Sequence, residues 1–499
     1  MSSAFGLKLF NSLTREIEPF TPVHEGEARV YSCGPTVYNY QHIGNMRAYV
    51  FADTLGRTLQ HRGLKLTHVI NITDVGHLTS DADEGEDKME KMAATQGKSA
   101  WDIAAFYQAD FEADLARLNV QQKQHPRATE YVEEMIAWGK SMADEHCYEL
   151  DSGLYFDIST VADYGKLARA VTEEGAEDSW GRIKKLEGKR NAGDFAIWRK
   201  TPEGETRQME WDSPWGKGAP GWHLECSVMG EKLLGFPFDI HTGGIDHREI
   251  HHPNEIAQNQ AFCGCGGLSE ARNSGANIWM HNNFLVERSG KMSKSSGEFL
   301  RLQLLLDKGY HPLAYRMMCL QAHYRSELEF SWEGLEAALT RLKRMVMAAR
   351  KASEAQSGWY ERPAEEQRKL SLNTSPKLVP LMEQFNEAIN NDLNTPEALP
   401  ILEAVLATKK IDPIERVNVA QWMDEVLGLN LFGLTREDLR IRPKSADITE
   451  SEIEEALAAR KAARAEKDFA RSDTIRDELA AKGVDVMDGD PLGWEWKLA

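Results

Sequence analysis

The segment at residues 42–45, with the sequence His-Ile-Gly-Asn, could bind a nucleotide phosphate. It lies between a strand predicted over residues 28–33 and a helix predicted over residues 44–62. At such a turn, backbone N–H groups and the helix dipole favour an anion, and glycine lets the anion approach closely. A polar loop that only caps the helix is the alternative. Four residues alone do not decide between the two.

A second segment that could bind phosphate lies at residues 290–297, with the sequence Gly-Lys-Met-Ser-Lys-Ser-Ser-Gly. Lys291 and Lys294 are point charges suited to polyphosphate. The flanking glycines would allow this loop to close over a bound ligand. A solvated basic loop is the alternative for this segment taken alone.

Together, the two segments resemble the paired ATP-binding signatures of class I aminoacyl-tRNA synthetases, and they occur in the family's order. Residues 31–38, 221–227 and 251–258 are similar to the zinc-ligand segments of the cysteinyl-tRNA synthetases. The resemblance extends over residues 31–494, and the sequence is identified as a member of that family.

This resemblance implies one zinc ion per chain, held by Cys33, Cys226, His251 and Glu255. Spacing alone does not predict the site, because these cysteines lack the close pairing of zinc fingers and a lone buried cysteine is usually a packing residue. Two thiolates and an imidazole nevertheless suit zinc, and a carboxylate can adjust when a substrate thiolate arrives. We expect Pro253 to mark the start of the helix that carries His251 and Glu255.

The resemblance also assigns the residues that contact the two small substrates. ATP would be bound, together with Mg²⁺, by His42, Gly44, Asn45, Gly243, Gly244, Asp246, Lys291 and Lys294. The residues expected to stabilise charge during catalysis are His42, Asn45, Lys291 and Lys294. The cysteine pocket would be lined by Thr73, Trp222 and His223. A strand-end cap for Thr73 and a core aromatic for Trp222 remain the alternatives.

Two departures from the family pattern affect the ATP site. Asn45 stands where the family often has a second histidine, so it can donate a hydrogen bond to phosphate but cannot carry charge. Residues 245–250 differ from the commoner family sequence, and this leaves the details of the ATP pocket open.

Basic residues near the C-terminus suggest contact with RNA. Arg460, Arg464, Lys467 and Arg471 are spaced four, three and four apart, which predicts a stripe on one face of one helix. A solvated face paired with acidic neighbours is the alternative. The resemblance implies anticodon contacts through Arg464, Phe469, Asp473 and Asp488. Aromatic and hydrogen-bonding side chains of this kind read unpaired bases.

The order of elements predicts an α/β fold. Strand, helix and strand within residues 28–72 form a βαβ unit, which requires parallel strands. We expect a class I Rossmann-like catalytic domain with a parallel sheet and an inserted connective domain, then a helical bundle and a small C-terminal domain. Strand character is predicted to resume near Trp222. The predicted boundaries are 1–119 and 213–299 for the two catalytic halves and 120–212 for the insertion. They are 300–350 for a stem-contact region, 351–448 for a helical tRNA-binding domain and 449–499 for anticodon recognition.

Composition limits the remaining possibilities. Six cysteines in 499 residues are too few for a disulfide framework. The net charge of -19 at first argues against a nucleic-acid partner, but one basic face can coexist with acidic surroundings. No secretory signal and no run of about 18 apolar residues is recognised, so we expect a cytoplasmic monomer without membrane contact.

The activity implied by the resemblance is that of a cysteine–tRNA ligase, with cysteine, ATP and tRNA(Cys) as partners. Zinc would select the substrate thiol. A mycothiol-pathway cysteine ligase is one alternative, and the helical region after Phe299 argues against it. A non-catalytic RNA-binding relative is another, and the presence of His42, Lys291 and Lys294 argues against lost chemistry.

Overall fold

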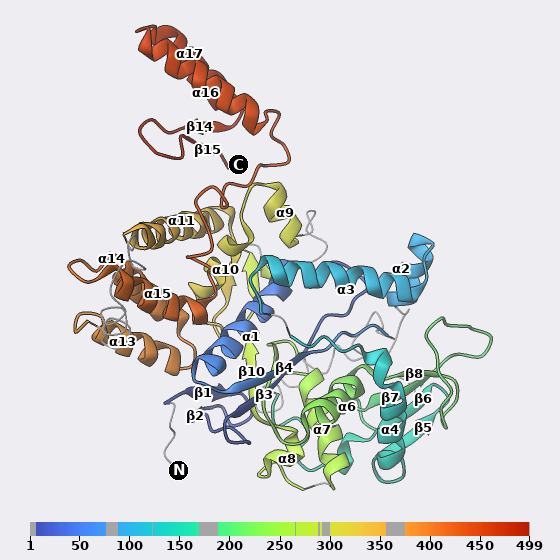
Figure 1. Ribbon diagram of the computed structural model, residues 1–499. Coiled ribbons are helices and arrows are strands. Elements are labelled where there is room, and N and C mark those ends of the chain that lie inside the picture. The colour runs from blue at the N-terminus through green and yellow to red at the C-terminus, as the bar shows by residue number, and fades with distance from the viewer. Residues whose placement is uncertain are drawn as a thin grey trace.

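The computed structural model describes residues 6–75, 88–121, 123–168, 188–264, 266–287, 290–291, 300–355 and 375–498. A parallel four-stranded sheet lies at its centre, in the order β10-β9-β3-β4 (Figure 1). Its strands are β3 (Glu27–Ser32), β4 (Lys65–Ile70), β9 (Phe238–Gly244) and β10 (Ala276–Asn282). Because β9 pairs directly with β3, the sheet joins two distant parts of the sequence. A hairpin of β1 (Lys8–Asn11) and β2 (Glu16–Pro19) contacts β10.

Helix α1 (Ile43–His61) connects β3 to β4 and packs against the sheet. Its buried residues include Met46, Val50 and Leu55, whose spacing predicted the helix. Gly63 follows the helix with φ 81°, a left-handed conformation that glycine adopts without a steric penalty. The predicted βαβ unit is therefore confirmed, and it places the turn at residues 42–45 at the carboxyl edge of the sheet.

The chain between the two halves of the sheet contains three helices and a second sheet, which share one hydrophobic core with the central sheet. Helices α2 (Lys88–Gln96), α3 (Ala100–Arg117) and α4 (Val132–His146) precede an antiparallel sheet, lower right in Figure 1. That sheet contains β5 (Cys147–Leu150), β6 (Gly153–Phe156), β7 (Phe195–Lys200) and β8 (Gly218–Pro220).

The prediction that a strand begins near Trp222 is wrong. Residues Trp222–Leu234 form helix α6, which contacts both β3 and the following helix α7 (His251–Cys263). Nearly every side chain from His223 to Gly230 is buried. A helix buried on all sides has no polar face, so its sequence shows no helical periodicity.

A helical region follows the central sheet. It contains α9 (Leu302–Asp307), α10 (Pro312–Leu320), α11 (Trp332–Glu354), α13 (Val379–Asn390), α14 (Thr395–Ala407) and α15 (Pro413–Leu427). A small sheet connects the central sheet to this helical region. It contains β11 (Leu285–Glu287), which follows β10, together with β12 (Gly290–Lys291) and β13 (Leu328–Glu329). None of the helices in the described ranges is long and apolar enough to cross a bilayer.

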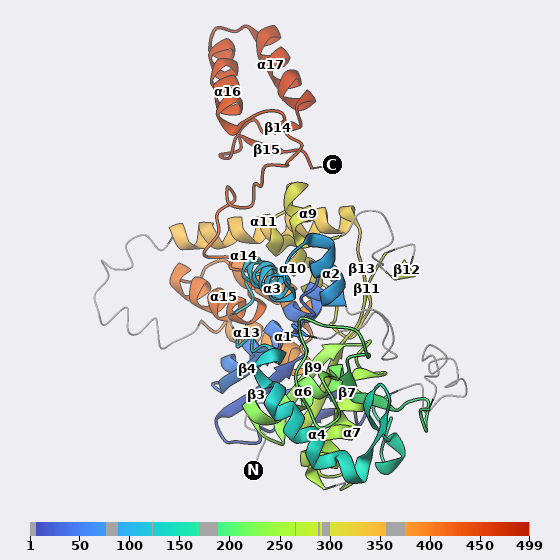
Figure 2. The ribbon, with the colours of Figure 1, turned by 90° about the vertical axis from the view of Figure 1, so that its right-hand side faces the viewer.

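The last part of the chain stands apart from the rest (Figure 2). It consists of α16 (Glu450–Ala465), α17 (Phe469–Ala481), β14 (Val484–Val486) and β15 (Trp494–Trp496). The predicted basic stripe on one helix is wrong, because Lys467 has φ 64° and separates α16 from α17. Arg460 and Arg464 lie on the first helix and Arg471 on the second.

Candidate functional site

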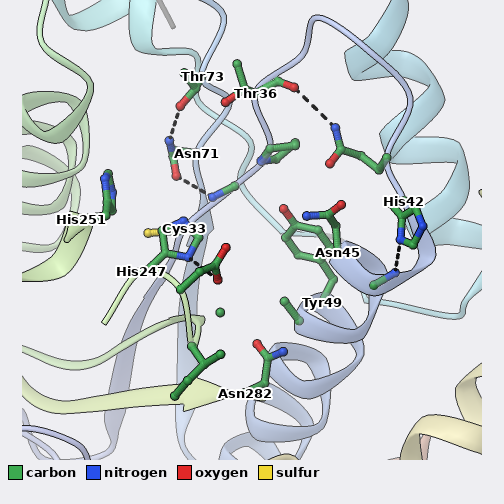
Figure 3. A pocket seen from close by; sticks show the side chains of 18 of the residues that line it. Cys33, Thr36, His42, Asn45, Tyr49, Asn71, Thr73, His247, His251 and Asn282 are labelled. Atoms are coloured by element: carbon green, nitrogen blue, oxygen red, sulfur yellow. Dashed lines mark hydrogen bonds and ion pairs between the residues drawn. The ribbon is translucent and has the colours of Figure 1, made fainter. Parts of the chain in front are cut away.

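A pocket of about 420 Å³ opens at the carboxyl ends of β3, β4 and β9 (Figure 3). In parallel α/β sheets this edge is where ligands bind. The loop after β3 contributes Cys33, the segment after β4 contributes Thr73, and the N-terminus of α1 contributes His42 and Asn45. The site therefore brings together segments from both halves of the catalytic sheet.

Four potential metal ligands meet on one side of this pocket. The ligand atoms of Cys33, Cys226, His251 and Glu255 lie within 4.8 Å of one another. A tetrahedral zinc ion spaces its ligands about 3.5 Å apart, so the cluster can close around zinc after small movements. Cys33, Cys226 and His251 also line the pocket, so a metal held by them would be accessible from it.

Helix α7 explains how two of these ligands meet. The helix begins at His251, so Pro253 lies inside its first turn and the prediction that Pro253 starts the helix is wrong. Proline is tolerated there because the first N–H groups of a helix have no partner within the helix. His251 and Glu255 therefore share one face, with Nε2 and Oε1 2.9 Å apart.

Two of the four side chains in the cluster are anionic, and a metal ion would displace the protons of the other two. The hydrogen bond with Cys33 lowers the pKa of the Cys226 thiol to about 6, whereas burial raises the pKa of Cys33 well above its ordinary value. Burial opposes ionisation of Glu255, but His241 and His251 outweigh it and lower that pKa to about 2. Burial likewise disfavours protonated His251, yet Glu255 and Cys226 raise its pKa to about 10. A thiolate and a carboxylate thus already face a cation.

A layer of histidines behind the cluster was missed by the sequence analysis. His252 lies 3.2 Å from the Cys33 sulfur and 2.8 Å from Nε2 of His281, whose Nδ1 lies 2.8 Å from the Ser12 hydroxyl. Nε2 of His241 lies 2.9 Å from Glu255. Cys33, His241, His252 and Glu255 form a second group with metal-ligand spacing, but His241 and His252 do not line the pocket.

The histidine layer orients two of the candidate ligands, Cys33 and Glu255. Burial lowers the pKa values of His252 and His281 well below the ordinary value, so both rings are neutral. A neutral ring donates through one nitrogen only, and the chain of contacts therefore fixes the ring orientations. His241 on β9 and His281 on β10, two buried histidines at strand positions, were the sequence signal for part of this layer, whereas His252 lies on α7.

A chain of hydrogen bonds joins the loop after β3 to the end of β4. The Gly34 N–H donates to Oδ1 of Asn71 at 2.8 Å, and the Asn71 amide donates to the Thr73 hydroxyl at 3.3 Å (Figure 3). Thr73 donates in turn to Oε2 of Glu225 at 2.9 Å. A Cβ at Gly34 would lie 1.5 Å from the Asn71 carbonyl oxygen, so only glycine allows this approach. Asn71 thereby sets the position of the loop that carries Cys33.

The opposite side of the pocket contains the predicted nucleotide residues. Nδ1 of His42 accepts from the Gly44 N–H at 3.1 Å, so the residue also caps α1, as the alternative interpretation proposed. Gly44, Asn45, Gly244 and Asp246 line the pocket as well. Gly243 precedes Gly244 on β9. A Cβ at position 243 would lie 2.7 Å from the His252 ring.

The two lysines predicted to bind ATP are described only in part. The backbone of Lys291 pairs with Val286 in the small sheet next to the pocket-lining residue Leu285. Lys294 lies outside the described residues.

The three residues predicted to contact cysteine occupy different positions. Thr73 and Trp222 line the pocket, and the Trp222 ring lies 4.4 Å from the His251 ring. His223 is buried, with its Nδ1 2.9 Å from Nδ1 of His251. His223 therefore contacts the candidate ligand His251 and does not line the pocket itself.

The predicted anticodon residues lie in the C-terminal unit, away from the pocket. Phe469 begins α17 and is 61% exposed. Asp488 forms ion pairs with Arg464 at 2.9 Å and with buried Arg460. Arg460 accordingly belongs to the structure of the unit, whereas Arg464, Phe469 and Asp473 are exposed.

Comparison with known proteins gives a consistent result. Residues 19–340 match the tRNA synthetases class I (C) catalytic domain, and residues 448–491 match the cysteinyl-tRNA ligase anticodon binding domain. The cysteine–tRNA ligase of Novosphingobium aromaticivorans is 69% identical, with 99% of this chain and 97% of that protein covered. The cysteine–tRNA ligase of Zymomonas mobilis is 52% identical, with 98% and 97% covered.

A solved structure shares the fold at low sequence identity. Mycobacterium tuberculosis methionyl-tRNA synthetase bound by methionyl-adenylate has a TM-score of 0.53 and 13% identity, with 85% of this chain and 97% of that chain covered. The likeness confirms the predicted class I architecture, and the sequence matches establish the family. The chain belongs to the cysteine–tRNA ligases, which are class I aminoacyl-tRNA synthetases.

Proposed function

We propose that this protein activates cysteine with ATP as cysteinyl-adenylate and transfers the cysteine to the terminal adenosine of tRNA(Cys). The observation that carries this proposal is one pocket with two different sides. Thiol and imidazole ligands lie on one side, and a helix N-terminus with His42 and Asn45 lies on the other. This arrangement suits a small substrate with a sulfur at one end and a carboxylate facing a phosphate at the other.

Adenylate formation requires orientation and charge stabilisation. The cysteine carboxylate attacks the α-phosphate in line, and pyrophosphate leaves. Because Nδ1 of His42 accepts the Gly44 N–H, the neutral ring carries its proton on Nε2 and can donate it to a phosphate oxygen. Asn45 donates from its amide, and Lys291 and Lys294 supply positive charge. Mg²⁺ bound with ATP would neutralise further phosphate charge.

The residues that would hold zinc are Cys33, Cys226, His251 and Glu255. A zinc ion held there would supply a soft Lewis acid that favours a substrate thiolate over the harder serine hydroxyl. Asn71 and the histidine layer keep Cys33 and Glu255 in position. Trp222 and Thr73 close the pocket beside these ligands.

Two assays on the purified full chain test the proposal. Cysteine should stimulate ATP–pyrophosphate exchange, and serine at the same concentration should not. With tRNA(Cys) added, the chain should then form cysteinyl-tRNA. Exchange without charging of tRNA would favour the mycothiol-pathway type of ligase, and no exchange would refute an activating enzyme.

A further inference from the structure

The C-terminal unit has a hydrophobic core of its own. Its buried residues are Ile448, Ile453, Leu479, Val484, Trp494 and Trp496, and they form a cluster separate from the core that runs through the rest of the chain. Leu498 packs against both clusters. Units joined without a large apolar interface move relative to one another unless other contacts hold them.

Strand β15 directs one acidic side chain out of this core. Successive residues of a strand point to opposite faces, and Trp494 and Trp496 point into the core. Glu495 between them therefore faces the helical region, where Lys343 of α11 lies 2.7 Å from Oε2. Nε of Arg436, in the segment after α15, lies 2.9 Å from Oε1. Each carboxylate oxygen thus has its own cation.

Arg436 and Arg440 extend this contact. Arg436 also bonds both oxygens of Asp490, at 2.7 and 2.9 Å. Burial disfavours the charge of Arg436, but Asp490 and Glu495 outweigh it and raise its pKa. The guanidinium of Arg440 lies 3.7 Å from the centre of a Trp494 ring and donates to the Trp494 carbonyl oxygen at 3.2 Å. A network of this kind holds orientation better than one isolated ion pair.

We propose that Glu495, bound by Lys343 and Arg436, is a positioning residue that fixes the orientation of the C-terminal unit relative to the catalytic pocket. Figure 2 shows why orientation matters: β15 lies at the end of the unit nearest the helical region, and the turn between α16 and α17 lies at the far end. Helix α17 has 13 residues. It is thus about 20 Å long, so a rotation of roughly 10° at the network moves Phe469 by about 3 Å.

Such a displacement would affect a tRNA that touches both the pocket and Phe469. The expected effect of this displacement on tRNA charging rests on the proposed function. The claim that Glu495 fixes the orientation of the C-terminal unit does not. The network is ionic and partly exposed, so salt should weaken it. Amino-acid activation, which uses the pocket alone, should not depend on it.

The test compares Glu495→Gln with Glu403→Gln in the full chain. Glu403 accepts from Arg341 of the same helix α11 at 2.9 and 3.0 Å, but both residues belong to the helical region. Fluorophores attached through non-natural amino acids at exposed Glu466 and Lys409 report the distance between the two units by energy transfer.

We expect a narrow distance distribution in the wild type and in Glu403→Gln at low salt. The distribution should be broad in Glu495→Gln, and should broaden in the wild type at high salt. Glu495→Gln should raise the KM for tRNA about fivefold, as expected for loss of such a pair, with cysteine-dependent exchange unchanged. Adding Lys343→Met to Glu495→Gln should broaden the distance distribution and raise the KM for tRNA little further, because both substitutions remove the same ion pair.

An unchanged distance distribution in Glu495→Gln overturns this proposal, as do additive effects of the two substitutions. Equal effects of Glu495→Gln and Glu403→Gln overturn it as well. Absence of cysteine-dependent exchange in the wild type refutes the proposed function instead, and the distance measurement still tests the network.

Discussion

Oε1 of Glu255 lies 2.9 Å from Nε2 of His251, one turn away on helix α7. In the absence of metal this is an ion pair, because the pKa of Glu255 is lowered to about 2 and that of His251 is raised to about 10. A metal ion would take the place of the shared proton. The pair therefore keeps both ligands oriented for a cation.

Replacement of Glu255 by glutamine should weaken zinc binding. The amide keeps the shape of the side chain but loses the charge, and we expect at least about a tenfold loss of zinc affinity. Competition with a chromophoric chelator measures it. Glu249→Gln is the control, since Glu249 pairs with Arg248 outside the cluster. Equal zinc affinity in Glu255→Gln and wild type would remove Glu255 from the ligand set.

Cysteine should perturb a metal bound at the cluster. In protein loaded with Co²⁺, cysteine should add a sulfur-to-metal charge-transfer band, because the substrate sulfur becomes a ligand. Serine should leave the spectrum unchanged. If cysteine binds by calorimetry without changing the spectrum, the metal is structural and selection depends on contacts such as Thr73 and Trp222.

Asn71→Ala should raise the KM for cysteine about tenfold, with a smaller effect on the KM for ATP. The substitution removes the hydrogen bonds of the Asn71 side chain with Gly34 and with Thr73. Steady-state exchange kinetics measure both constants. Asn259→Ala is the matched control, since Asn259 is also buried, does not line the pocket and donates to the Ser274 carbonyl oxygen at 2.9 Å. A similar rise in the control would attribute the effect to general destabilisation.

Asp53 should stabilise the protein in a pH-dependent way. It is fully buried, with Arg57 at 2.6 Å, Arg316 at 2.7 Å and Lys123 at 3.8 Å. Burial opposes its charge, but the cations outweigh burial and lower the pKa from 3.8 to about 2. Since the folded pKa lies below the unfolded one, its stabilisation is present above pH 4 and is lost as the pH falls towards 2.

Asp53→Asn should therefore lower the free energy of unfolding by about 3–5 kcal/mol at pH 7, because it leaves buried cations unpaired. The difference from wild type, measured by urea denaturation, should shrink between pH 4 and pH 2. Exposed Asp477→Asn should show no difference at either pH. A difference for Asp53→Asn that does not change with pH would contradict the assigned pKa.

Phe469→Ala should weaken tRNA binding without affecting cysteine activation. An exposed aromatic ring that stacks on a base contributes about 1–3 kcal/mol, which corresponds to roughly a five- to 150-fold change in affinity. Filter binding of tRNA(Cys) measures it. Ile17→Ala removes an exposed apolar side chain from β2, outside the segments predicted to contact tRNA, and should change nothing. Equal affinity of Phe469→Ala and wild type would exclude Phe469 from the RNA surface.

The sequence predicted the parts of the fold that follow simple patterns. Spacing of Met46 and Val50 identified α1, whereas α6 was misread because its buried sides conceal the helical period. The break at Lys467 was missed because a left-handed conformation is unusual for lysine. The four candidate metal ligands came from resemblance. His252 and Asn71 were not anticipated, because their roles depend on contacts between distant segments.

The pairing of β3 with β9 has a consequence for synthesis of the chain on the ribosome. Cys33 leaves the ribosome early, and Glu255, which approaches it in the folded protein, follows 222 positions later. At a synthesis rate of roughly 5–20 residues per second, the edge of β3 that pairs with β9 stays unpaired for many seconds. The inserted sheet is complete before β9 appears, so the nascent protein can order this layer first. Metal capture would then be a late event that marks completion of the catalytic half.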